Sequence, residues 1–89
     1  MAVYKSLGSR QCEGGGPEPS ALAEPLRQAG VPVLATACGQ DGRMRAAMCG
    51  LSDGRIAVFD IPADRLEDAQ KLGYGPLSAL PDATRAACR

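Results

Sequence analysis

The sequence predicts a small α+β domain, and three observations carry that prediction. Two Asp-Gly pairs separate short β-prone runs, an amphipathic stretch follows the last run, and a weaker helical stretch lies nearer the N-terminus. Asp-Gly readily adopts the positive φ angles of a hairpin turn, so two such pairs in succession predict an antiparallel meander. The expected order is β-α-β-β-β-α, a single mostly antiparallel sheet with both helices packed on it.

Four strands are expected. Residues 31–38 are β-prone, residues 43–49 alternate at first, and residues 55–61 (R-I-A-V-F-D-I) form the strongest strand pattern in the chain. Residues 3–12 form a further candidate strand before the first helix. A right-handed β-α-β crossover would then place the first strand parallel to, and beside, the second.

The two helices differ in how clearly they are marked. The second has Pro62 at its first position and Gly73 as its C-terminal cap. The first has Ser20 as a candidate N-cap and ends at Gly30. Pro25 conflicts with this frame, because it removes one backbone hydrogen bond. The first helix is therefore expected to start later or to bend at that proline.

The length of 89 residues corresponds to one domain. We assign residues 1–74 to a single small α+β domain and residues 75–89 to a loosely ordered C-terminal tail, which has little periodicity. A domain of this size buries a small core, and chains in this position often rely on disulfides, a metal or a partner subunit. Four cysteines make disulfides the first candidate.

Composition excludes several classes of function. The chain has no His, which rules out Ser-His-Asp and Cys-His catalysis within it and any zinc site that needs His. A net charge of zero and 3% aromatic residues argue against a nucleic-acid partner. No apolar run reaches the length of a membrane span. We therefore predict no catalytic residue, no cofactor and no metal. Whether the chain is an enzyme is left open, and a non-enzyme is favoured.

Two segments invite a ligand-loop interpretation. Residues 38–43 and 49–55 share the frame C-G-(x)-x-D-G-R, which can be a duplicated ligand loop or two equivalent turns. We favour turns, since Asp41 and Asp53 supply too few oxygens for a calcium loop. The Gly-rich segment 13–17 precedes a helix but lacks a complete phosphate-loop motif, so we interpret it as a linker.

The expected topology constrains cysteine pairing. Cys38 and Cys49 would lie at opposite ends of a hairpin, too far apart for a disulfide. Cys12 and Cys38 would finish at the same sheet edge, so we predict the pair Cys12–Cys38, worth about 3.5 kcal/mol in the loop-entropy model. Cys49 is then expected as a buried unpaired thiol and Cys88 as an exposed one.

Arginines form the one candidate patch for an anionic partner. Arg43 and Arg45 would project from the same strand face, with Arg55 nearby. The alternative is that they simply form the solvated face of the sheet. If the helices cover only one side of the sheet, its other side is a candidate surface for a protein partner.

Three stretches carry a resemblance to other proteins. S-L-G-S-R-Q-C-E-G-G-G, C-G-Q-D-G-R and D-G-R-I-A-V-F-D-I-P resemble stretches of small, uncharacterised bacterial proteins, some of which have export leaders. The likeness spans roughly residues 6 to 77. It implies a bacterial envelope location and carries no known activity, so it transfers no functional residue.

The leading functional hypothesis is a non-enzymatic binding or assembly module of the bacterial cell envelope, periplasmic or otherwise exported. Its motivation is the lack of a catalytic constellation together with a small core supported by cysteines. One alternative is a small thiol-redox protein or enzyme that uses Cys12, Cys38 or Cys49. Another is a cytosolic regulatory domain that binds a small ligand on the sheet.

Overall fold

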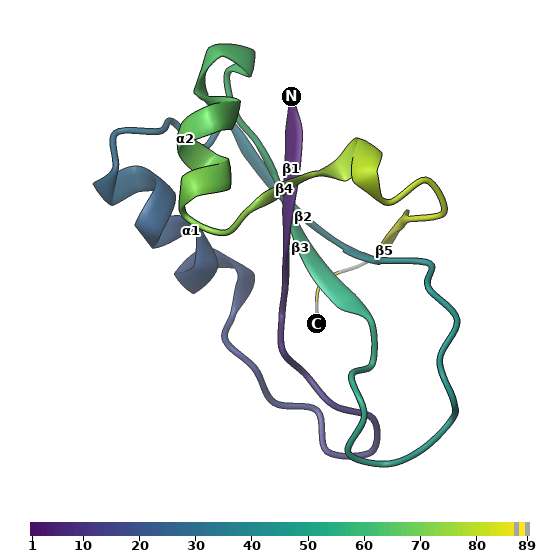
Figure 1. The fold of residues 1–89 in the computed structure, drawn as a ribbon. Helices are drawn as coiled ribbons and strands as arrows, with labels where there is room; N and C mark the ends of the chain where they lie inside the picture. Colours follow the sequence, from purple (N-terminus) through teal and green to yellow (C-terminus); the bar gives the residue numbers. More distant parts are fainter. Residues whose placement is uncertain (87, 89) are drawn as a thin grey trace.

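One five-stranded antiparallel sheet organises the chain in the computed structural model, which describes residues 1–86 and 88 (Figure 1). The strand order is β4-β1-β3-β2-β5. With two helices beside the sheet, the α+β class predicted from the sequence is confirmed. The strands are β1 (Ala2–Ser6), β2 (Ala35–Gln40), β3 (Arg55–Asp60), β4 (Gly75–Pro76) and β5 (Thr84–Ala86).

Helix α1 (Pro19–Gln28) follows β1, and helix α2 (Leu66–Lys71) follows β3. Short 3-10 turns, η1 (Ala63–Arg65) and η2 (Leu77–Ala79), precede α2 and follow β4. Helix α1 begins one residue before Ser20, with Glu18 at the N-cap position, and it accommodates Pro25 inside its length. The expected N-cap at Ser20 is therefore wrong, because Pro19 supplies a preset helical φ and needs no N–H at the first turn.

Strand β3 is the centre of the sheet. It pairs antiparallel with β1 on one side and with β2 on the other, so that Phe59 lies opposite Val3 and Thr36. Strands β1 and β2 run in the same direction but β3 separates them, so their expected adjacency is wrong. A strand whose four inner residues are all buried is most stable in the middle of a sheet, with a neighbouring strand on each edge.

Both helices pack on one face of the sheet, as the sequence analysis expects (Figure 1). The Tyr74 ring meets the Phe59 ring edge to face, with centroids 6.0 Å apart, and its hydroxyl donates to the Leu22 carbonyl of α1. Burial raises the pKa of that hydroxyl. The fully buried members of this face are Val3, Ala23, Leu26, Val31, Ala57, Phe59, Ile61, Ala69 and Tyr74.

The opposite face is covered by the C-terminal segment. Ile56 and Val58 point away from the helices and pack with buried Leu80, flanked by Leu77 and Ala83. Figure 1 shows this segment on the side of the sheet away from α1 and α2. The surface expected to be open for a protein partner is therefore occupied here by the chain itself.

The C-terminal part of the chain differs from the expected loose tail. Residues 75–86 contribute β4, η2 and β5, and β4 and β5 are the two edge strands of the sheet. The tail prediction also includes Ala87 and Arg89, which lie outside the described residues.

Residues 43–49, expected to be a strand, lie instead within the connection from β2 to β3. The reason is that β5 pairs with the outer edge of β2, through Cys38, Gly39 and Gln40. No edge of β2 then remains for another strand beside those positions. The strand expected over 31–38 begins later, at Ala35, because Pro32 has no N–H to give to a ladder.

Replacement of Leu80 by Ala tests the packing of the C-terminal segment. We expect Leu80→Ala to lower the free energy of unfolding by about 2–3 kcal/mol, since it removes buried methyl groups and leaves a cavity. Chemical denaturation measures the change. The control is Leu34→Ala, whose side chain is 67% exposed and which should shift stability by no more than about 0.5 kcal/mol. Equal effects of the two variants would contradict this packing.

Candidate functional site

The long loop 41–54 between β2 and β3 is closed at its base by the repeated D-G-R motifs. Asp41 Oδ1 accepts from the Arg43 backbone N–H at 3.0 Å, and Asp53 Oδ1 accepts from the Arg55 N–H at the same distance. The glycine inside each motif has a positive φ, 74° and 77°. The Asp41 N–H donates to the Gly54 carbonyl at 2.9 Å, which joins the two turns. The repeat is therefore one turn used twice, which agrees with the interpretation favoured from the sequence.

Two of the three arginines in the expected anionic-partner patch are ion-paired within the chain. Arg45 makes two short hydrogen bonds, 2.8 and 2.6 Å, to the Asp41 carboxylate. This pairing with Arg45 lowers the pKa of Asp41. Arg55 Nε lies 3.5 Å from Asp53 Oδ2, whereas none of the ion pairs found among residues 1–86 and 88 uses Arg43.

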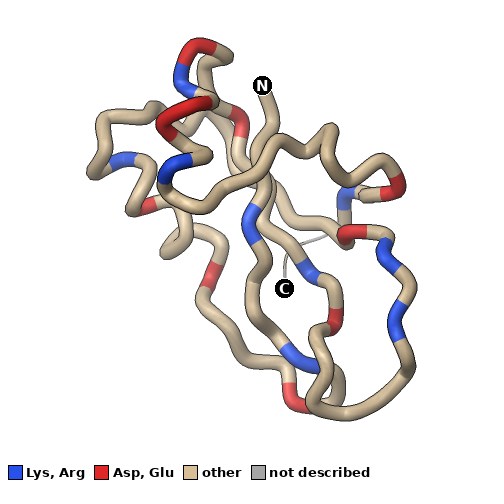
Figure 2. The backbone as a smooth tube through the Cα atoms, viewed as in Figure 1, with Lys and Arg blue, Asp and Glu red and all other residues tan. Residues whose placement is uncertain are grey.

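The three arginines also do not share a strand face. Arg43 and Arg45 belong to loop 41–54, and Arg55 begins β3. Figure 2 shows blue and red residues interspersed along this loop and its neighbours, with no single basic face in view. The patch predicted from the i, i+2 spacing of Arg43 and Arg45 is not formed, because these residues lie in a loop and not in a strand.

Gln11 clamps the loop with both its backbone and its side chain. Its backbone N–H donates to Leu51 and its carbonyl accepts from Gly50. Its side-chain amide donates to the carbonyls of Ala46 and Ser52, at 3.0 and 3.3 Å, and accepts from the Met48 N–H at 3.0 Å. A segment without regular secondary structure is thereby held at several points by a single residue.

The first disulfide lies beside this clamp and joins Cys12 to Cys49, with Cα atoms 5.1 Å apart. The predicted bridge Cys12–Cys38 is wrong, as is the expectation that Cys49 is a buried free thiol. The cause is the topology. Strand β1 ends at Ser6, so Cys12 lies in the turn beyond it, and β3 separates β1 from β2. Cys12 adopts a φ of 70°, unusual for a residue with a side chain.

The second disulfide joins Cys38 of β2 to Cys88, also with 5.1 Å between Cα atoms. It fastens the end of the chain next to the point where β5 pairs with β2. The expectation that Cys88 is an exposed free thiol is therefore wrong. In the loop-entropy model, closures over separations of 37 and 50 residues each stabilise the fold by about 4 kcal/mol.

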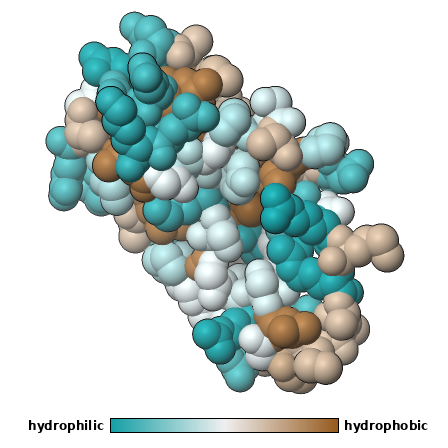
Figure 3. Space-filling model, viewed as in Figure 1, coloured by the Kyte–Doolittle hydropathy of each residue, from teal (hydrophilic) through white to brown (hydrophobic). Residues whose placement is uncertain are grey.

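Large apolar side chains stand exposed on the clamped loop. Met44 is fully exposed, Met48 is 59% exposed and Leu51 is 40% exposed. Figure 3 shows brown and tan residues at the end of the molecule that lies farthest from the helices. These three side chains, which we call the loop apolar group, lie on a segment held by a disulfide and by Gln11.

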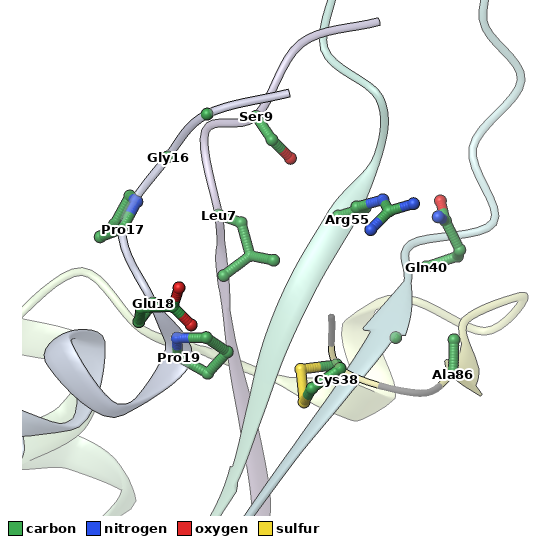
Figure 4. Close-up of a pocket in the computed structure, with 13 residues that line it drawn as sticks. Leu7, Ser9, Gly16, Pro17, Glu18, Pro19, Cys38, Gln40, Arg55 and Ala86 are labelled. Carbon is green, nitrogen blue, oxygen red and sulfur yellow. A yellow bond between two sulfur atoms is a disulfide. The ribbon is translucent and has the colours of Figure 1, made fainter. Parts of the chain in front are cut away.

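A pocket of about 340 Å³ opens beside the base of the loop (Figure 4). Its polar walls come from Glu18 before α1 and from Arg55 and Gln40 of the sheet. Its apolar lining includes Leu7 and the Cys38–Cys88 disulfide. The Gly-rich segment, expected to be a plain linker, contributes part of the lining, with Gly15 and Gly16 among the residues that face the pocket.

Within the part of the chain that the structure describes, no group of three or more His, Cys, Asp or Glu side chains is placed to hold a metal ion. None of the helices there is long and apolar enough to span a membrane.

Comparisons with protein-family profiles, curated proteins and solved structures find no match for the chain.

Sequence reasoning missed Gln11 and Glu18 as residues of these sites. No local signal marks Gln11, because its partners are 35 to 41 residues away along the chain. Glu18 had a weak signal, since it stands between two prolines directly before a helix. The importance of the segment around Asp41 and Asp53 was visible as the repeated motif.

Tryptic digestion without reduction tests the disulfide pairing. Cleavage after Arg and Lys puts each cysteine in its own peptide, namely 11–27, 28–43, 46–55 and 86–89. We expect mass spectrometry to find 11–27 linked to 46–55, and 28–43 linked to 86–89. Reduction before digestion is the control and should release all four peptides. A linked pair of 11–27 with 28–43 would restore the bridge predicted from the sequence and contradict the structure.

Substitution of Gln11 by Ala tests the clamp. We expect Gln11→Ala to speed hydrogen exchange of the Met48 amide at least tenfold, because that amide loses its acceptor. The side-chain bonds together should contribute about 1–2 kcal/mol to stability. Gln70→Ala, at an exposed helical site, is the matched control. Unchanged exchange at Met48 in the Gln11 variant would show that the loop is held by the disulfide alone.

Proposed function

We propose that this chain is a non-enzymatic binding module of the bacterial cell envelope, and that loop 41–54 is the surface that contacts a protein partner. The observation that carries the proposal is the full exposure of Met44 on a loop that is locked in place. Exposed methionine on a mobile loop is common. Here, however, a disulfide and the hydrogen bonds of Gln11 hold the loop in one position.

The cysteines support the proposed exported location. All four are paired, and disulfides of this kind persist in oxidising compartments, whereas cytosolic thiols are kept reduced. The resemblance of three sequence stretches to small bacterial proteins, some of which have export leaders, supports the same assignment. An exported location also suits a small core that gains much of its stability from cross-links.

Preorganisation of loop 41–54 favours its binding to a partner. Binding normally costs conformational entropy when a loop becomes ordered at an interface. Loop 41–54 is already ordered in the folded chain, through the Cys12–Cys49 bridge and the bonds from Gln11, so binding need not order it again. The apolar side chains of Met44 and Met48 are then free to pack against a partner, and unbranched thioethers adapt well to varied apolar surfaces.

The charges beside the loop apolar group point to the chemistry of the partner. Arg45 is engaged by Asp41, while the ion pairs among the described residues leave out Arg43, which neighbours Met44. A partner segment with apolar side chains and an adjacent carboxylate would complement this surface. Such a segment would satisfy Arg43 while covering the exposed methionine.

The thiol-redox alternative has less support. A redox-active pair usually lies in a C-x-x-C motif near a helix N-terminus, where the thiolate is stabilised. Cys12 and Cys49 are 37 residues apart and lie in a turn and a loop, and Cys38 lies in a strand. Each bridge instead fastens a segment that has little regular structure of its own.

Site-specific photo-crosslinking in the envelope of the producing bacterium tests the proposal. A benzophenone amino acid replaces Met44 in one variant and Leu34, which is equally apolar and also exposed, in the control. We expect a discrete adduct from position 44 and none from position 34. The crosslinked segment of the partner, sequenced by mass spectrometry, should be apolar with a neighbouring Asp or Glu, and Arg43→Gln should reduce the yield several-fold.

Three outcomes would overturn the proposal. Equal adducts from both positions would show non-specific contact, and no adduct from position 44 would remove the interface. An adduct of twice the mass of the chain would identify self-association in place of a different protein partner.

A further inference from the structure

The pocket beside loop 41–54 carries charges of opposite sign on facing walls. Glu18 stands on the wall formed before α1, and Arg55 and Gln40 stand on the sheet side (Figure 4). Leu7 and the Cys38–Cys88 disulfide lie between these walls. We propose that this pocket binds a small zwitterion, a free amino acid or a short peptide, with its ammonium group at Glu18 and its carboxylate at Arg55.

The Glu18 side chain takes part in none of the ion pairs found among residues 1–86 and 88. Glu18 occupies the N-cap position of α1, yet its side chain makes no capping hydrogen bond. Its backbone carbonyl accepts from the N–H groups of Ala21 and Leu22, as the carbonyl of any N-cap residue does in the first turn of a helix. The carboxylate is therefore available to a ligand, and Figure 4 shows it turned toward Leu7 and the interior of the pocket.

The opposite wall is suited to a carboxylate. Arg55 and Gln40 lie opposite each other in the β2–β3 ladder, which brings a guanidinium and an amide together. The contact of Arg55 with Asp53 runs through Nε, at 3.5 Å from Asp53 Oδ2. Figure 4 shows the end of the guanidinium extending toward Gln40, and a guanidinium can hold a carboxylate through two parallel N–H bonds.

The size and floor of the pocket select the ligand class. A volume of about 340 Å³ lies at the lower end of the usual range for ligand pockets, roughly 300–1,000 Å³. That volume suits an amino acid or dipeptide better than a nucleotide. Leu7, Pro17 and Pro19 add apolar surface on which a small aliphatic side chain can rest.

A phosphate ligand fits less well. Gly15, Gly16 and the start of α1 line the pocket in a manner typical of anion sites. However, the Glu18 carboxylate stands at the same place and would repel a dianion. The pairing of one acid with one base across the pocket favours a ligand that itself carries both charges.

This inference goes beyond the proposed protein interface and does not depend on it. The pocket residues and the loop apolar group do not overlap, so each can be altered separately. Met44→Ser should leave ligand binding unchanged, and Glu18→Gln should leave the crosslink from position 44 unchanged.

Nuclear magnetic resonance titration of the ¹⁵N-labelled full chain tests the pocket. The probes are glycine, leucine, alanyl-alanine, its N-acetyl and C-amide derivatives, and inorganic phosphate. We expect at least one zwitterion to shift the amides of Gly16, Gly39 and Arg55 in a saturable manner. Each singly blocked form of the dipeptide should bind at least tenfold more weakly, because it lacks one of the two charged contacts.

Variants assign each charge to its wall. Glu18→Gln should weaken the zwitterion about tenfold while leaving the N-acetyl form unaffected, since that form has no ammonium group. Arg55→Gln should show the converse, with the C-amide form unaffected. Glu24→Gln, an equal change of charge on the outer side of α1, is the control and should bind as the unaltered chain does.

The blocked ligands keep the test decisive even if the Arg55 variant fails to fold, because they use the unaltered protein. Absence of saturable pocket shifts with every zwitterion, up to tens of millimolar, would overturn the proposal. Equal affinity for blocked and unblocked dipeptide, or tighter binding of phosphate than of any zwitterion, would overturn it as well.

Discussion

Burial of strand β3 on both faces is the constraint on which the rest of the structure depends. Its four inner residues need two covering layers, and the chain supplies them from different places. The helices cover Ala57 and Phe59, and the C-terminal segment covers Ile56 and Val58. Both β1 and β2 pair with β3. The position of β3 therefore also decides where the turn after β1, the pocket and loop 41–54 lie.

The parts of the fold that sequence predicted well are those governed by local physics. The R-I-A-V-F-D-I run forms a strand as predicted, because it is apolar and β-prone, although its central place in the sheet was not predicted. Gly73 follows the second helix as expected, whereas Pro62 precedes the 3-10 turn η1 and α2 itself begins only at Leu66. The failures concern partners distant in sequence. Nothing local indicates that β5 takes the outer edge of β2, and that pairing is what turns residues 43–49 into a loop.

The cysteine pairing shows how one topological error spreads. The predicted bridge assumed that β1 and β2 are neighbours, whereas β3 lies between them. The candidate site was foreseen in part, because the repeated D-G-R frame marked the base of loop 41–54 and its role as a turn. Gln11 could not be foreseen, since a glutamine has the same local pattern whether it is solvated or holds a loop 35 or more residues away.

The order of the two bridges along the sequence decides what a proteolytic cut in the loop would do to the molecule. Cys12–Cys49 and Cys38–Cys88 interleave along the sequence, so each closed ring contains one end of the other. Any peptide bond between Cys12 and Cys88 therefore lies inside at least one ring, and those between Cys38 and Cys49 lie inside both. A nick at Arg43 or Arg45, on the exposed loop, would open the backbone while two covalent links still hold the halves together. The most accessible segment is thus also the one whose cleavage the covalent network tolerates best.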